Sequence, residues 1–109
     1  MPTIILKLTP ERLVNPVADL RYVVPDLMAE RSAGVIADDG YDYIDDTYEM
    51  LIYLQVTDVA GATEIILETL EKERPLGNDL RPGCVVAVKR DGGYDVIFPA
   101  SFQEEFREG

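Results

Sequence analysis

The chain has no histidine, no tryptophan and a single cysteine among its 109 residues. Without histidine, every Ser-His and Cys-His catalytic arrangement is excluded. The one cysteine, Cys84, cannot form a disulfide within the chain, which favours a reducing compartment. No apolar run approaches the ~18 residues that suggest a membrane span, and residues 1–10 lack the regions of a signal peptide. We therefore expect a cytoplasmic protein.

Basic residues are scarce and unevenly placed. The chain has 10 Lys and Arg against 21 Asp and Glu, which gives a net charge of −11. Residues 34–58 contain acidic residues but no basic one. Nucleic-acid-binding proteins neutralise phosphates with Lys and Arg, and anionic membranes attract basic segments. We therefore predict no nucleic acid and no membrane as a partner, whereas a basic protein or a cation remains compatible.

The length and the hydrophobic content predict one folded unit. Apolar residues make up 47% of the chain, which is enough for a core, and single domains most often hold roughly 100–150 residues. No internal repeat, low-complexity tract or linker interrupts the sequence. We predict a single α+β domain over residues 1–109.

In the first half of the chain, the pattern predicts a strand, a helix and a second strand. Residues 2–8 alternate, with Ile4, Leu6 and Leu8 on one side. Thr9-Pro10 and Asn15-Pro16 both resemble helix starts. Apolar residues at helical spacing predict a helix over residues 17–34, with a kink or a break at Pro25. Residues 34–44 are plausibly extended and 45–47 form a turn.

In the second half, the pattern predicts a strand, a helix and a hairpin. Residues 48–56 are apolar on both faces, which is typical of a central strand covered on both sides. Asp58 is a candidate cap for a helix that Pro75 ends, and residues 84–99 with the turn at Asp91-Gly92-Gly93 carry a hairpin pattern. Strands and helices in this order look like the ferredoxin-like plait (βαββαβ) with a C-terminal β-hairpin extension, and with both helices on one face of a mainly antiparallel sheet.

The segment 37–50 concentrates six carboxylates and three tyrosines without a basic residue. Clustered carboxylates steer a basic partner, and tyrosines supply broad contact area at low entropic cost. We therefore predict a partner-binding surface here. Its predicted residues are Asp38, Asp39, Tyr41, Asp42, Tyr43, Asp45, Asp46 and Tyr48.

Two other interpretations of segment 37–50 stay open. Aspartates at turns and on an edge strand can simply satisfy backbone donors and discourage aggregation. Asp38, Asp42, Asp46 and Glu49 fall at positions one, five, nine and twelve of a calcium-binding EF-hand loop, but Gly40 offers no ligand atom and Tyr43 stands where that loop needs glycine. We predict no metal site and no cofactor.

Other candidate residues favour structural roles. Cys84 opens an apolar run, which indicates a buried thiol rather than a reactive one. Arg21 and Arg31 are expected to pair with nearby acids, namely Asp19, Asp26 and Glu30. The glutamates expected on the exposed face of the second helix are Glu64, Glu68 and Glu71.

The end of the chain carries three phenylalanines spaced by four residues. Phe98, Phe102 and Phe106 would form one stripe if the segment were helical. We expect this segment to pack back on the core rather than to form a dimer contact.

Taken together, these patterns predict no enzymatic activity. They predict a small acidic binding protein that engages a basic protein, as a regulatory module or as an inhibitor of the kind formed by acidic immunity proteins, whose composition is similar. The alternative is a homodimeric ferredoxin-like domain that binds a small molecule at the sheet face or the dimer interface.

Overall fold

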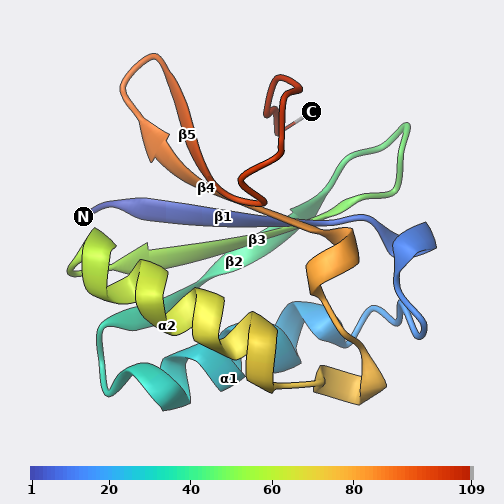
Figure 1. Ribbon diagram of the computed structural model, residues 1–109, viewed down its shortest axis with the longest axis horizontal. Helices are drawn as coiled ribbons and strands as arrows, with labels where there is room; N and C mark the ends of the chain where they lie inside the picture. The colour runs from blue at the N-terminus through green and yellow to red at the C-terminus, as the bar shows by residue number, and fades with distance from the viewer. Residues whose placement is uncertain (109) are drawn as a thin grey trace.

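The computed structural model describes residues 1–108, which form a five-stranded sheet and two α-helices (Figure 1). In chain order the elements are β1 (Thr3–Leu8), α1 (Leu20–Ser32), β2 (Ile36–Tyr43), β3 (Met50–Val56), α2 (Val59–Lys72), β4 (Cys84–Arg90) and β5 (Gly93–Phe98). Short 3₁₀ turns cover Pro10–Arg12, Pro75–Gly77 and Arg81–Gly83. The Thr9-Pro10 pair, which resembled a helix start, therefore begins only the short Pro10–Arg12 turn.

The sheet is antiparallel between all neighbouring strands, in the order β2-β3-β1-β4-β5. Both helices lie on the same side of it (Figure 1). The predicted α+β class, with helices on one face of an antiparallel sheet, is therefore confirmed. The finer prediction, a ferredoxin-like plait, is not confirmed by this five-stranded sheet.

The main core fills the space between the helices and the sheet. Even-numbered residues of β1, β3 and β4 point to this side, and α1 and α2 cover them with buried aliphatic residues. Burying an aliphatic side chain of this size contributes roughly 1.5–3 kcal/mol. The helical residues in this core are Leu20, Val24, Met28, Ala62, Ile66 and Leu70.

Helix α1 differs from its prediction at two points. It begins at Leu20 rather than near Val17, and Asn15 caps no helix because its backbone is bonded to the Asn78 side chain. The chain stays helical through Pro25, so no break occurs there. The Pro25 ring is buried, and this burial offsets the lost amide bond.

Helix α2 agrees with its sequence pattern. The Asp58 side chain accepts a hydrogen bond from the Gly61 amide at 3.2 Å, as an N-cap residue should. Glu68 and Lys72 form an i,i+4 pair, with 3.9 Å between Oε1 and Nζ. The predicted outward glutamates Glu64, Glu68 and Glu71 are all exposed.

The sheet face opposite the helices, called the back face below, carries a second core. Ile5, Leu51 and Ala87 form its floor, and Phe106 covers them. The pattern of residues 2–8 predicted burial on one side only, and that was wrong because Ile5 and Lys7 are buried too. The cause is the C-terminal tail (residues 99–108), which crosses the back face on the side away from the helices (Figure 1).

The C-terminal tail is not helical, but it packs on the core as expected. Phe106 is buried and Phe102 is half-buried on the back face, whereas Phe98 packs against the core on the helix side. The three rings therefore do not share one stripe.

Strand β3 is covered on both faces, as predicted. Met50, Ile52, Leu54 and Val56 face the helices, and Leu51 and Tyr53 face the back. The predicted strand, however, also included Tyr48. That part was wrong, because Tyr48 lies in the preceding turn with φ of 60°.

Within residues 1–108, neither helix has the length and apolar character needed to cross a bilayer. The hairpin predicted at residues 84–99 is present as β4 and β5, which pair from Arg90–Gly93 outward.

Candidate functional site

The eight residues predicted to bind a partner lie along strand β2 and the turn that follows it. Strand β2 is an edge strand, since it pairs only with β3. Its pairing shifts between Asp38 and Tyr41, where Gly40 adopts a φ of 95°. All eight side chains are exposed. We call this set the acidic–tyrosine surface: Asp38, Asp39, Tyr41, Asp42, Tyr43, Asp45, Asp46 and Tyr48.

None of the five aspartates on this surface forms an ion pair with another residue of the described chain. Two of them bind local backbone instead. The Asp38 carboxylate accepts from the Gly40 amide at 2.9 Å, and the Asp42 carboxylate accepts from the Tyr43 amide at 2.8 Å. The edge strand therefore carries negative charge that no cation of residues 1–108 neutralises by direct contact.

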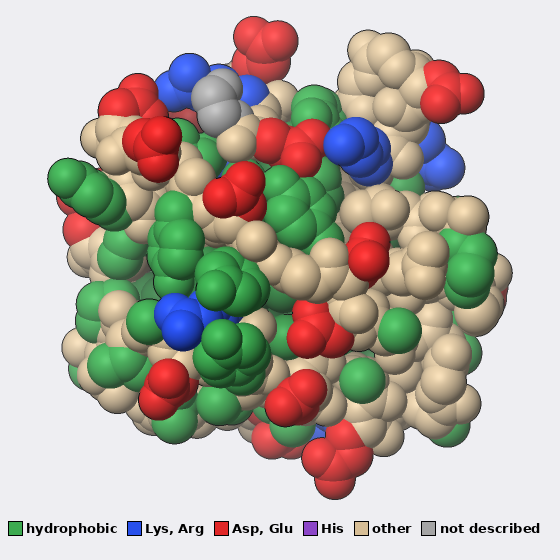
Figure 2. Space-filling model, turned by 180° about the vertical axis from the view of Figure 1, so that it is seen from behind, with side chains coloured by type: hydrophobic (Ala, Val, Ile, Leu, Met, Phe, Trp, Pro, Cys, Tyr) green, Lys and Arg blue, Asp and Glu red, His purple; other side chains and the backbone are tan. Residues whose placement is uncertain are grey.

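Three tyrosines and one arginine form a cluster beside the aspartates. The rings of Tyr22 and Tyr41 meet edge to face with centroids 6.0 Å apart, and Tyr41 meets Tyr43 in the same way at 5.9 Å. The Arg21 guanidinium carbon lies 4.6 Å from the centroid of Tyr22 and 4.9 Å from that of Tyr41. Arg21 Nη1 also donates to the Tyr43 hydroxyl at 3.3 Å. Figure 2 shows one face of the molecule, on which a basic side chain lies among a group of hydrophobic ones, with acidic side chains nearby.

The Arg21 charge changes the electrostatics of the cluster. By hydrogen bonding and by its positive charge, the Arg21 guanidinium lowers the pKa of Tyr22. The Arg21 Nε atom is buried and has no hydrogen-bond partner, so the flat guanidinium is held mainly by its aromatic neighbours. Such cation–π contacts are worth roughly 0.5–1 kcal/mol at exposed sites. The aromatic part of the surface is therefore ordered before any partner arrives.

Arg21 and Tyr22 were missed by the sequence prediction of this surface. Arg21 and Arg31 were expected to pair with Asp19, Asp26 and Glu30, and that was wrong. Arg31 instead bridges to α2, with Nη2 2.5 Å from Glu68 and Nη1 2.8 Å from Glu73. Helix α1 packs beside β2, so Arg21 meets tyrosines that lie about twenty residues away in the sequence. No local pattern reports such a contact.

The back face carries a second group of polar residues, at the end of the C-terminal tail. The Glu108 carboxylate accepts hydrogen bonds from the hydroxyls of Tyr53, at 2.9 Å, and Tyr94. It also lies 3.1 Å from the Lys89 ammonium. Burial opposes the charge on Glu108, but these three donors lower the pKa of the carboxyl. Glu108 therefore fastens the tail to β3 and β4–β5.

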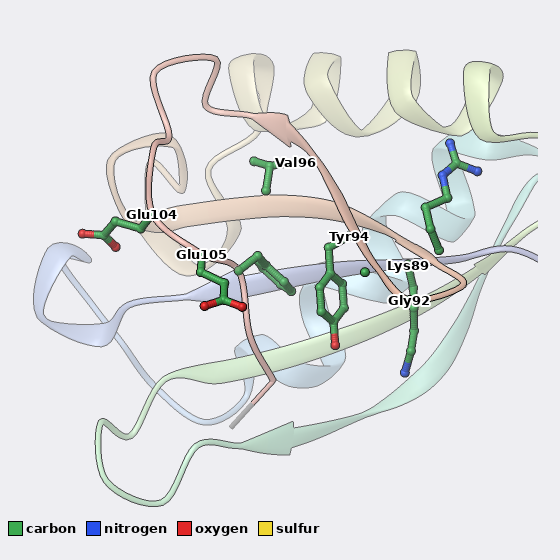
Figure 3. Close-up of a pocket in the computed structure, with 9 residues that line it drawn as sticks. Lys89, Gly92, Tyr94, Val96, Glu104 and Glu105 are labelled. Atoms are coloured by element: carbon green, nitrogen blue, oxygen red, sulfur yellow. The ribbon is translucent and has the colours of Figure 1, made fainter.

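A hollow of about 560 Å³ opens beside this fastening, between the tail and the β4–β5 hairpin. Figure 3 shows Lys89 and Tyr94 extending from the hairpin in the same direction, with Glu104 and Glu105 on the tail. Its walls combine carboxylates with Lys89 and Arg90, and Arg90 is already paired with Asp95 at 2.8 Å. Nothing in this arrangement favours one ligand over another.

The described residues offer neither a reactive thiol nor a group of metal ligands. Cys84 is buried, as expected, and burial raises the pKa of its thiol to about 12, which keeps the nucleophilic thiolate out of reach near neutral pH. Among residues 1–108, no three Cys, Asp or Glu side chains gather closely enough to hold a metal ion.

Comparisons with protein families, with curated proteins and with solved structures gave no match. The function is therefore inferred from the chemistry of the surface alone.

Proposed function

We propose that the protein is a non-catalytic, cytoplasmic binding protein that engages a basic protein partner through the acidic–tyrosine surface. It would act as a regulatory module or as an inhibitor of the immunity type. One observation carries the proposal: five exposed aspartates without an ion pair in residues 1–108 lie beside an ordered cluster of tyrosines.

The aspartates and the tyrosines of this surface would contribute to binding in different ways. The uncompensated carboxylates raise the association rate of a positively charged partner and select against acidic ones. The rings of Tyr22, Tyr41 and Tyr43 supply apolar contact area, and their contacts with Arg21 reduce the entropy lost on binding. Aromatic residues beside charge are a common composition of binding hot spots.

The experiment compares two variants of equal net charge. The first carries Asn at Asp38, Asp39, Asp42, Asp45 and Asp46, because an amide oxygen can still accept the local bonds of Asp38 and Asp42. The second neutralises five exposed acids elsewhere that form no ion pair in the described chain: Asp26, Glu30, Glu64, Glu71 and Asp91.

Each protein is used to capture partners from its cell extract at low and at high salt, and association rates are then measured with the partner identified. We expect the first variant to associate roughly tenfold or more slowly and with a weaker salt dependence. The second variant should bind nearly as the unmodified protein does. Equal rates for both variants would mean that only bulk charge matters, and unchanged rates for the first would refute the proposal.

A second candidate function is the binding of a small molecule at the sheet face, within a homodimer. The observation that favours it is a groove of about 1130 Å³ on the back face. The dimer part has less support, because Phe106 already covers the middle of that face. Light scattering at high protein concentration tests for the dimer.

We also propose that β1 to β4, with both helices, are a variant of the ferredoxin-like plait. The support is that α1 connects β1 to β2 and α2 connects β3 to β4 on the same side of the sheet. Strand β5 is an addition at one edge.

A further inference from the structure

Lys7 occupies an unusual position for a lysine, in the middle of the back face. It lies on the central strand β1, opposite Leu51 of β3 and Val85 of β4. Only 8% of its surface is exposed. Lysine is almost never buried to this extent unless it is paired.

Within residues 1–108, the Lys7 ammonium forms neither a hydrogen bond nor an ion pair, although the Lys7 backbone is paired in the sheet. The centroid of the Phe106 ring lies 4.6 Å from Nζ. The Glu49 carboxylate, which precedes β3, acts on Lys7 through its charge, but it is already held by two hydroxyls: Thr9 and Thr47 each donate to it at 3.0 Å. A lysine side chain that is largely buried and has no ion-pair partner is costly, so its presence requires an explanation.

Lys7 lines the back-face groove of about 1130 Å³, which runs between the sheet, the Pro10–Arg12 turn and the C-terminal tail. Arg12 and Arg107 also line it, and neither forms an ion pair with another described residue. Together with Lys7 they place three cations without an ion pair among the described residues in this groove, beside four carboxylates that also line it: Glu11, Glu49, Glu104 and Glu105.

We propose that this groove binds a small monocarboxylate with an apolar body, whose carboxylate pairs with the Lys7 ammonium. The apolar body would lie against Phe102 and Val85, which line the same groove. A single negative charge fits best, because the four carboxylates that also line the groove would repel a dianion more strongly. This site is separate from the acidic–tyrosine surface, apart from Tyr48 at the rim of the groove, and does not depend on the function proposed for it.

The first test is a titration of the ¹⁵N-labelled protein with sodium benzoate, followed by amide chemical shifts. We expect saturable shifts in the millimolar range, centred on β1, β4 and the tail. Benzamide has the same ring without the charge, and phosphate has charge without the ring, so both should bind at least tenfold more weakly. Absence of saturation with benzoate, or equal binding of benzamide or phosphate, would overturn the proposal.

The second test compares two variants that each lose one positive charge. Lys7→Met keeps an unbranched side chain of similar length and should bind benzoate at least tenfold more weakly. Lys72→Met, on the exposed side of α2 with the lysine side chain 61% exposed, should bind as the unmodified protein does. Removing a desolvated charge should leave Lys7→Met folded, which its thermal unfolding checks. Benzoate binding that survives in Lys7→Met would refute the assignment.

The third test uses pH and needs no variant. Burial lowers the pKa of Lys7, and Arg107 lowers it further, whereas Glu49, Glu104 and Glu108 raise it without reversing the shift. Only the protonated amine pairs with a carboxylate. Affinity for benzoate should therefore be highest at neutral pH and fall as the pH rises through a pKa below 10.5. A constant affinity across that range would argue against Lys7 as the anchor.

Discussion

Single residues in this protein show how buried polar groups are normally satisfied. The Asn78 side chain is fully buried and makes three hydrogen bonds to backbone. It accepts from the Asn15 amide at 2.7 Å and donates to the carbonyls of Asn15, at 2.9 Å, and Pro75, at 3.2 Å. It thereby joins two loops that lie about sixty residues apart in the chain. Lys7 is the contrasting case, since no comparable partner holds its ammonium.

We predict that Asn78→Ala lowers the free energy of unfolding by about 2–3 kcal/mol, because backbone groups of Asn15 and Pro75 lose their partner in the interior. The matched control is Asn15→Ala, which keeps the backbone groups that contact Asn78 and loses only an exposed bond to the Leu76 carbonyl. It should cost less than about 1 kcal/mol. Urea unfolding measures both, and equal costs would contradict the role given to Asn78.

At the residue scale, the sequence predicted what depends on local chemistry. The burial of Cys84 was correctly predicted from the apolar run that this residue opens. The capping role of Asp58 was correctly predicted from its place before a helical pattern. The contact of Arg21 with Tyr43 was not predictable, because it depends on α1 packing beside β2. For the same reason the burial of Lys7, which depends on a tail about one hundred residues later, could not be predicted.

Among the elements, the edge strand β2 shows that one feature can serve two roles. An exposed edge invites pairing with another chain, and charges or bulges prevent it. Strand β2 has both, with the shift at Gly40 and two aspartates that bind amides of their own strand. The interpretation as protection against aggregation is thus compatible with docking of a basic partner, because charge that repels a second copy attracts an opposite charge.

The C-terminal tail stabilises the back face of the sheet through its buried ring, Phe106. We predict that Phe106→Ala destabilises the protein by about 3 kcal/mol, since it removes a buried ring from above Ile5, Leu51 and Ala87. Phe102→Ala, at a half-buried ring, should cost clearly less. Hydrogen exchange should also rise in β1 and β5 of Phe106→Ala. Equal losses of stability in the two variants would contradict the idea that Phe106 is the main contact between the tail and the sheet.

The elements themselves were predictable where local pattern and packing agree. Helix α2, strand β3 and the β4–β5 hairpin lie close to their predicted ranges. The start of α1 was misplaced, because the Asn15 backbone bonds to Asn78 instead of entering the helix. The tail was not recognised as an irregular cover, since phenylalanines four residues apart match a helical stripe that the chain does not form.

For the molecule as a whole, charge opposes the compact state. A net charge of −11 on 109 residues leaves more repulsive than attractive pairs at the surface. We predict that thermal stability at pH 7 rises as sodium chloride increases from low to physiological concentration, because exposed charges are then screened. The variant with Asn at the five aspartates of the acidic–tyrosine surface should show a smaller rise. Calorimetry measures both, and a melting temperature that falls with salt would contradict this account.

The charged edge strand β2 makes the tendency of the protein to aggregate depend on pH. At the isoelectric point of about 4.2 the net charge of the molecule is zero, so the long-range repulsion between two copies is lost. The exposed tyrosines and the outer peptide groups of edge strand β2 are then less protected against pairing with a second copy. Purification and storage well above that pH should therefore limit aggregation through this edge.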